Sequence, residues 1–141
     1  MSHSDAFPYA GVLASLDAGD FAGLAAELVD TLQKREALHA LLKAAEAVHR
    51  AAVGTTQVAD ALRRDQKFVR PGPPSPHLVR LRQQQAAARQ ATNQARQAFI
   101  VAADAWIRVF GFAVPPKIRL ESYAEGWLRE LADMIEAKPP G

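Results

Sequence analysis

The sequence predicts an all-α protein: a long antiparallel helical hairpin, forming a coiled-coil-like arm, packed with two shorter helices at an aromatic base. Three observations lead to this prediction. Apolar residues recur at helical spacing, a proline-rich turn separates the two longest helical segments, and no alternating β-branched run is long enough for a strand. At 141 residues the chain has the length of one compact domain, so we expect residues 1–141 to form a single helical domain.

The first two helices are predicted from capping signals and apolar spacing. A short apolar helix is expected over residues 8–17, with Gly19 as its stop and Asp20 as the N-cap of the next helix. That second helix is expected over residues 20–68. Its apolar face is formed by Phe21, Leu24, Leu28, Leu32, Leu38, Leu41, Ala45, Val48 and Ala52. Gly54 could break this helix, but one glycine costs only about 1 kcal/mol relative to alanine, so a kinked and nearly continuous helix is favoured.

A second long helix is expected after the turn 70–76, whose four prolines exclude helical geometry. It covers residues 77–110 and has an inward seam with alternating steps of three and four residues. The seam consists of Leu78, Leu81, Gln85, Ala88, Thr92, Ala95, Phe99, Ala102, Trp106 and Val109. Residues 111–116 end this helix, and a final amphipathic helix is expected over residues 121–137.

Antiparallel packing of the two long helices places most of the large side chains at one end. The aromatic residues expected to meet there are Phe21, Trp106, Phe110, Phe112, Tyr123 and Trp127. The other end has mostly Ala, Gln and Arg, which can pair two helices but cannot build a wide core. Leu41, Leu42 and Val79 are expected to remain as exposed apolar flanks, which favours self-association.

Charge is segregated along the chain. Residues 61–103 contain eight basic side chains and the single acid Asp65, a net charge of +7, whereas the rest of the chain has a net charge of −5. Such asymmetry indicates a region that faces a polyanion, on an otherwise acidic body.

The composition excludes several classes of protein. Without cysteine there is no disulfide framework, no thiolate metal site and no cysteine nucleophile, which suits a cytoplasmic protein. Neither a signal peptide nor a continuous apolar run of membrane-spanning length is present, so we expect a soluble, unprocessed chain with no membrane partner.

Catalytic and metal-binding motifs are weak. Glu36 with His39, and Glu46 with His49, have the Glu-x-x-His spacing of dinuclear metal bundles, but both pairs lie on one helix and residues 77–103 of the facing helix contain no carboxylate. No serine lies in a nucleophile elbow, and no phosphate-binding glycine loop follows a strand. The chain is therefore expected to be no enzyme and to hold no metal or other cofactor.

The most specific functional feature is the density of arginine around the proline turn. The predicted nucleic-acid-binding residues are Arg63, Arg64, Lys67, Arg70, Arg80, Arg82 and Arg89. Guanidinium groups without neighbouring acids suit bidentate binding of phosphate, and the nearby glutamines add neutral donors and acceptors. The predicted function is that of a non-enzymatic adaptor or accessory protein that presents this arm to DNA or RNA without sequence preference. The alternative is a structural or assembly subunit, in which the arm binds a protein partner or a second copy.

Overall fold

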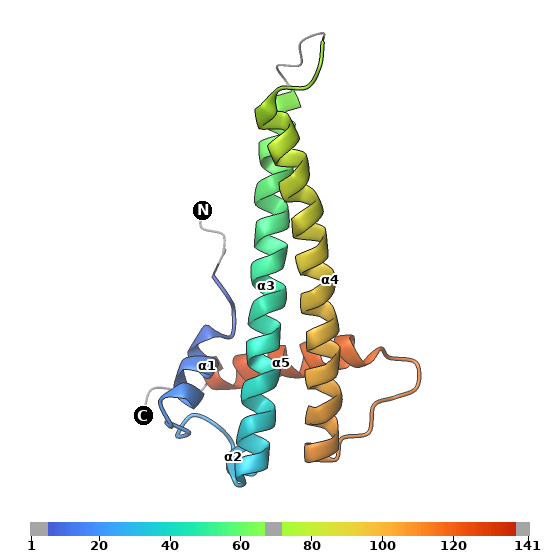
Figure 1. The fold of residues 1–141 in the computed structure, drawn as a ribbon. Helices are drawn as coiled ribbons and strands as arrows, with labels where there is room; N and C mark the ends of the chain where they lie inside the picture. Colours follow the sequence, from blue (N-terminus) through green and yellow to red (C-terminus); the bar gives the residue numbers. More distant parts are fainter. Residues whose placement is uncertain (1–5, 67–71, 138–141) are drawn as a thin grey trace.

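The computed structural model describes residues 6–66 and 72–137, and within them every regular element is a helix. The order is α1 (Ala10–Asp17), α2 (Ala26–Val29), α3 (Leu32–Gln66), α4 (Pro76–Phe110) and α5 (Leu120–Ala137). In Figure 1, α3 and α4 form a tall antiparallel hairpin, while α1, α2 and α5 gather around its lower part. The predicted all-α hairpin is confirmed. No helix in the described ranges is long and apolar enough to cross a membrane.

Both ends of α4 are set by local sequence. Ser75 is the N-cap, since its side-chain Oγ accepts a hydrogen bond of 3.1 Å from the backbone N–H of Leu78. Pro76 was expected to lie in the turn before the helix, but it takes the first helical position, where a missing N–H costs nothing. At the other end, Gly111 adopts φ 73°, and its N–H donates to the carbonyl oxygen of Ile107 at 2.8 Å.

The start of α3 differs from the prediction. The long helix was expected from residue 20, but it begins at Leu32, because Thr31 caps it through a hydrogen bond from the backbone N–H of Lys34 to Thr31 Oγ1 at 3.1 Å. Asp20 Oδ1 accepts from the N–H of Ala22 at 3.2 Å in a local turn instead of capping a helix. This break lets the segment before α3 bury Leu24, Leu28 and Val29, whereas Leu32 is 64% exposed.

Gly54 does not interrupt α3, which continues to Gln66. Nothing lies within 4 Å of the position that a Cβ atom would take at Gly54, so packing does not require a glycine there. The hydroxyls of Thr55 and Thr56 donate to the carbonyl oxygens of Ala51 and Ala52, which satisfies these polar groups inside the helix.

The inward seam of α4 is largely as predicted. Leu81, Phe99 and Trp106 are buried, and the smaller seam residues between them are partly buried. Val109 departs from the prediction, with 37% of its surface exposed. The expected exposure of Leu41 and Leu42 was wrong: both are fully buried, because α3 is packed by α1 and α2 as well as by α4. Val79 is exposed, as expected.

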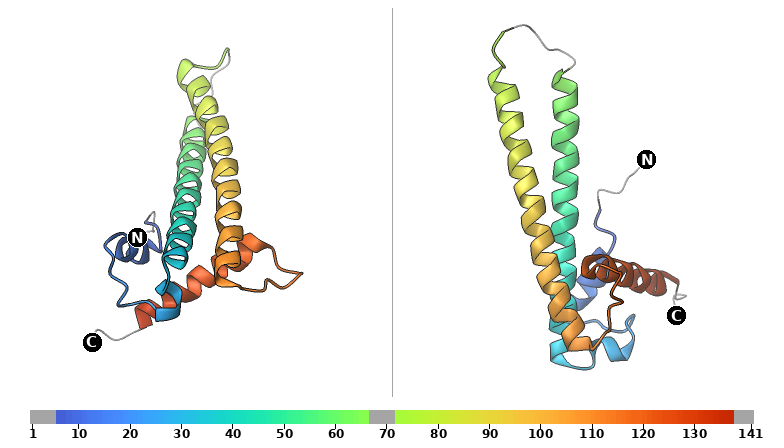
Figure 2. Two further views of the ribbon diagram at one scale, coloured as in Figure 1. Left: turned by 60° about the horizontal axis from the view of Figure 1, so that its bottom comes forward. Right: turned by 90° about the vertical axis from the view of Figure 1, so that its right-hand side faces the viewer.

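The predicted aromatic base is confirmed, except that Phe21 does not join it. Among the described residues the Phe21 ring has no aromatic partner, and the guanidinium carbon of Arg35 lies 5.1 Å from its centroid. Trp106 is fully buried, and its ring centroid lies 4.9 Å from that of Trp127, 5.1 Å from Phe112, 6.0 Å from Tyr123 and 6.2 Å from Phe110. The tilted and edge-on geometries are those that the ring quadrupoles favour. Helix α5, which supplies Tyr123 and Trp127, runs across the lower part of the hairpin in the left view of Figure 2 and projects to one side of it in the right view.

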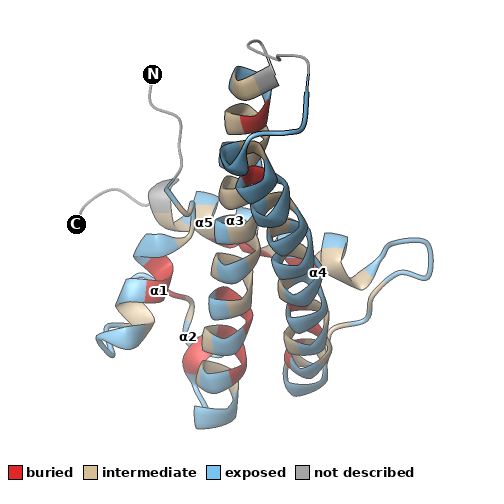
Figure 3. Cartoon of the chain, turned by 45° about the horizontal axis from the view of Figure 1, so that its top comes forward, coloured by how far each residue is buried: buried red, intermediate tan, exposed pale blue. Residues whose placement is uncertain are grey.

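Residues 51–66 of α3 and residues 72–95, which include the start of α4, form what we call the arm. The remaining described residues form the base. Of the arm residues whose burial is described, only Leu62 and Leu81 are buried. Figure 3 shows the upper part of the hairpin as mostly exposed or intermediate, with most of the buried positions lower down, in the base. Between these leucines and the base, the two helices are joined by a 3.2 Å hydrogen bond between the hydroxyls of Thr55 and Thr92. The arm is thus a two-helix structure with a narrow, partly polar seam.

Candidate nucleic-acid interface

Five of the predicted binding residues lie on the arm in the described part of the chain. Arg63 and Arg64 are in the last turn of α3, and Arg80, Arg82 and Arg89 follow the start of α4. All five are exposed. The other two predicted residues, Lys67 and Arg70, lie outside the described residues. The hairpin therefore brings two basic clusters, far apart in sequence, to the same end of the molecule (Figure 1).

Most of these arginines have no acidic partner. Arg63 pairs with Asp60, one turn earlier on α3. Among the described residues, the guanidinium groups of Arg64, Arg80, Arg82 and Arg89 form no ion pair. Unpaired guanidinium groups keep their donors available for an external anion, and no internal contact has to be broken first.

Two of the arginines, one from each helix, line the same hollow. Arg63 from α3 and Arg82 from α4 line one hollow of about 280 Å³, together with Ala59, Leu62 and Gln85. Arg89 lies seven residues after Arg82, hence on the same side of α4 and about 10 Å further along its axis. Arg80 points from nearly the opposite side of the helix, since two residues correspond to about 200° of helical rotation. Arg63, Arg82 and Arg89 therefore lie along one side of the hairpin, and Arg80 lies on nearly the opposite side of α4.

Neutral polar side chains extend this surface. The exposed ones are Gln83, Gln84, Gln90, Asn93, Gln94 and Gln97, all on α4, while Gln85 is partly buried in the hollow. Amide groups can donate to phosphate oxygens or meet base edges, so they suit a nucleic acid as well as solvent.

Arg96 lies on the same side of α4 as Arg82 and Arg89, but its side chain forms an ion pair with an acid of the base. Its guanidinium Nη2 lies 3.3 Å from Oε1 and 3.4 Å from Oε2 of Glu121 on α5. This ion pair joins α4 to the start of α5, where the positive surface of the arm ends. Sequence spacing alone does not reveal the link, because the two residues are 25 positions apart.

The two Glu-x-x-His pairs do not form a metal centre. Residues 6–66 and 72–137 contain no group of three or more His, Asp or Glu side chains that could hold one ion. Instead, the His39 ring nitrogen Nε2 lies 2.6 Å from Asp17 Oδ1, which links α3 to the end of α1. Glu46 pairs with Lys43 and Arg50 on its own helix, and the His49 ring lies 5.8 Å from the Phe7 ring. Of these contacts, the one between His39 and Asp17 joins two helices, whereas those of Glu46 lie within α3.

Comparison of the chain with models of protein families, with curated proteins and with solved structures finds no match.

Proposed function

We propose that this chain is a non-enzymatic, cytoplasmic accessory protein whose arginine-rich arm binds DNA or RNA through the phosphate backbone. The observation that carries the proposal is the charge of the arm. It has five exposed arginines, four of them without an acidic partner in the described part of the chain, and two helices contribute to one hollow. Lys67 and Arg70 add two further cations in the connecting sequence.

Phosphate is the ligand that this chemistry favours. A guanidinium group binds a phosphate oxygen pair in a bidentate manner, and each neutralised phosphate releases condensed counterions from the nucleic acid. The arm has few large apolar or aromatic side chains on its described surface that could read or stack bases. Affinity is therefore expected to come from charge, to fall steeply with salt and to depend little on sequence.

The test is fluorescence anisotropy of a labelled single strand and a labelled duplex, at about 50 mM salt, with two variants of equal charge. The arm variant replaces Arg63, Arg64, Arg80 and Arg82 by Gln. The control variant replaces four exposed arginines of the base by Gln: Arg50, Arg108, Arg119 and Arg129. Both variants change the net charge from +2 to −2, so only the position of the charges differs.

We expect the arm variant to bind at least about 100-fold more weakly than the unmodified protein, because four cations of the arm are removed. The control variant should lose less than about fivefold, through the long-range field alone. Equal losses in both variants, or an arm variant that binds like the unmodified protein, would contradict the proposal. Circular dichroism of both variants checks that the fold is retained.

One observation favours the second candidate function, an assembly subunit. Helix α4 has an exposed face with alternating steps of three and four residues, separate from its inward seam. The face consists of Ala87, Ala91, Gln94, Ala98, Val101 and Ala105, and Val101 is 69% exposed. A second copy of the chain could pack its α4 against this face.

Sedimentation velocity tests this second function. If the face forms a dimer, Val101→Lys should dissociate it, whereas Val79→Lys, which changes an exposed valine outside the face, should leave it intact. A chain that is monomeric at all concentrations, or a dimer that tolerates Val101→Lys, would contradict this role.

A further inference from the structure

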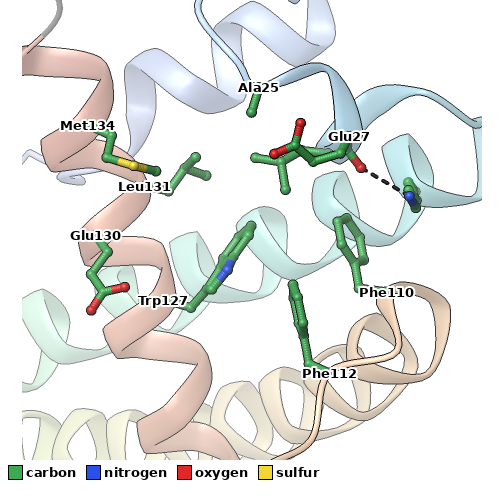
Figure 4. Close-up of a pocket in the computed structure, with 10 residues that line it drawn as sticks. Ala25, Glu27, Phe110, Phe112, Trp127, Glu130, Leu131 and Met134 are labelled. Atoms are coloured by element: carbon green, nitrogen blue, oxygen red, sulfur yellow. Dashed lines mark hydrogen bonds between the residues drawn. The ribbon is translucent and has the colours of Figure 1, made fainter.

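The base contains a pocket that is separate from the candidate nucleic-acid interface on the arm. Its volume is about 410 Å³, within the range of small-molecule sites. Phe110, Phe112 and Trp127 line one side, and Figure 4 shows their rings projecting into the space between α5 and the segment that carries α2. Leu131 and Met134 extend from α5 into the same space. The walls are thus mainly aromatic and aliphatic.

The charged groups of this pocket are mainly acidic. Glu27 and Glu130 both line it, and among the described residues neither carboxylate has an ion-pair partner. In Figure 4 the Glu27 side chain lies across the pocket from Trp127, and Glu130 lies at the edge.

Lys34 is the one cation among the described residues that line the pocket, and it already has partners. Its ammonium Nζ lies 3.2 Å from Asp30 Oδ1, donates to the backbone carbonyl oxygen of Glu27 at 3.1 Å, and lies 5.8 Å from the centroid of the Phe110 ring. Its charge is therefore balanced by Asp30. What remains for a ligand is an aromatic wall and two unpaired carboxylates.

From this arrangement we propose that the pocket binds a small organic cation with an apolar or aromatic body, such as an aryl-alkyl ammonium. The apolar body fits against Phe112, Leu131 and Met134, while the ammonium lies between the face of Trp127 and the carboxylate of Glu27. Tryptophan is the aromatic side chain that attracts a cation most strongly, and a nearby carboxylate adds to that attraction. Met134, which is 58% exposed, has a flexible side chain that can adapt to ligands of different shape.

The experiment uses three probes of similar size: phenethyltrimethylammonium, its uncharged carbon isostere 3,3-dimethylbutylbenzene, and the anion 4-phenylbutyrate. Saturation-transfer NMR detects binding, and isothermal titration calorimetry measures Kd. The test variant is Glu27→Gln, an exposed position whose change removes the charge and keeps the shape. Asp133→Asn, on the exposed side of α5 and outside the pocket lining, is the matched control.

We expect the cation to bind at least about tenfold more tightly than the isostere and the anion. Glu27→Gln should weaken cation binding about fivefold and leave the isostere unaffected, whereas Asp133→Asn should change neither. Trp127→Phe should also weaken the cation selectively, because phenylalanine attracts a cation less than tryptophan does. Equal binding of cation and isostere, preference for the anion, or no binding of the cation at millimolar concentration would overturn the proposal. Nucleic-acid binding by the arm is not involved in any of these outcomes.

Discussion

The base and the arm of this molecule are built from the same two helices but differ in what surrounds them. In the base, α3 and α4 are enclosed by α1, α2 and α5, and nearly all the buried apolar side chains form one cluster around Trp106. In the arm the same helices have only each other, and Leu62 and Leu81 are the buried residues there. Burial of apolar surface is the main stabilising term, so the base should determine stability.

The charges follow the same division. Several acidic side chains of the base form ion pairs with lysine and arginine, as in Asp30 with Lys34 and Glu121 with Arg96. On the arm, four of the five described arginines have no such partner. Because the enclosed base supplies the buried core, the arm helices do not need one, and their surface can be used for binding.

The largest effect on stability is expected from Trp106→Ala. This substitution removes the fully buried ring at the centre of the aromatic base, and comparable changes cost about 3–5 kcal/mol in the free energy of unfolding. Urea denaturation followed by circular dichroism measures the change. Val101→Ala on the same helix, at a position 69% exposed, should cost less than about 0.5 kcal/mol. Similar costs for the two variants would contradict the assigned core.

A smaller effect is expected when one leucine is truncated in each region. Leu41→Ala in the base should cost about 3–4 kcal/mol, because the side chain is fully buried among several helices. Leu81→Ala in the arm should cost about 2 kcal/mol or less, since fewer neighbours surround it. Hydrogen exchange should show the Leu81→Ala effect confined to the arm. A global loss of protection would show that arm and base unfold as one unit.

The smallest of these effects is expected at the two helix caps. Thr31→Ala in the base and Ser75→Ala at the tip each remove a side-chain acceptor at 3.1 Å from a helical N–H, a change that typically costs about 1 kcal/mol. Thr31→Ala should lower the thermal midpoint of the whole protein, because α3 begins there within the base. Ser75→Ala should speed hydrogen exchange mainly in the first turns of α4 and lower the midpoint less. The reverse order would contradict the division into a stabilising base and a projecting arm.

Local signals in the sequence were enough to predict the hairpin and its aromatic base. The seam of α4 depends on spacing alone, and its ends depend on Ser75, Pro76 and Gly111, whose capping chemistry is local. The cap at Thr31 was missed, because the apolar spacing continues from Leu28 to Leu32 across it. Periodicity indicates which residues share a face, but it does not show that a helix is interrupted.

The burial of Leu41 and Leu42 was missed for a different reason. A single apolar face suffices for a helix with one partner, but α3 in the base has several neighbours, so a second face is buried. The pocket beside Trp127 depends on the same tertiary arrangement, since its far wall is made by the segment that folds back before Thr31. The arginines of the candidate interface were identifiable because charge segregation is a property of the sequence itself.

The most direct test of the central claim, that the arm is a phosphate-binding element, is the salt dependence of binding by the unmodified protein. Anisotropy titrations of a labelled duplex between about 50 mM and 200 mM salt give the slope of log K against log salt. With five described arginines available on the arm, the expected slope is about −3 to −5. A slope near zero, or no binding at the lowest salt, would contradict the claim and leave the arm as a surface for protein.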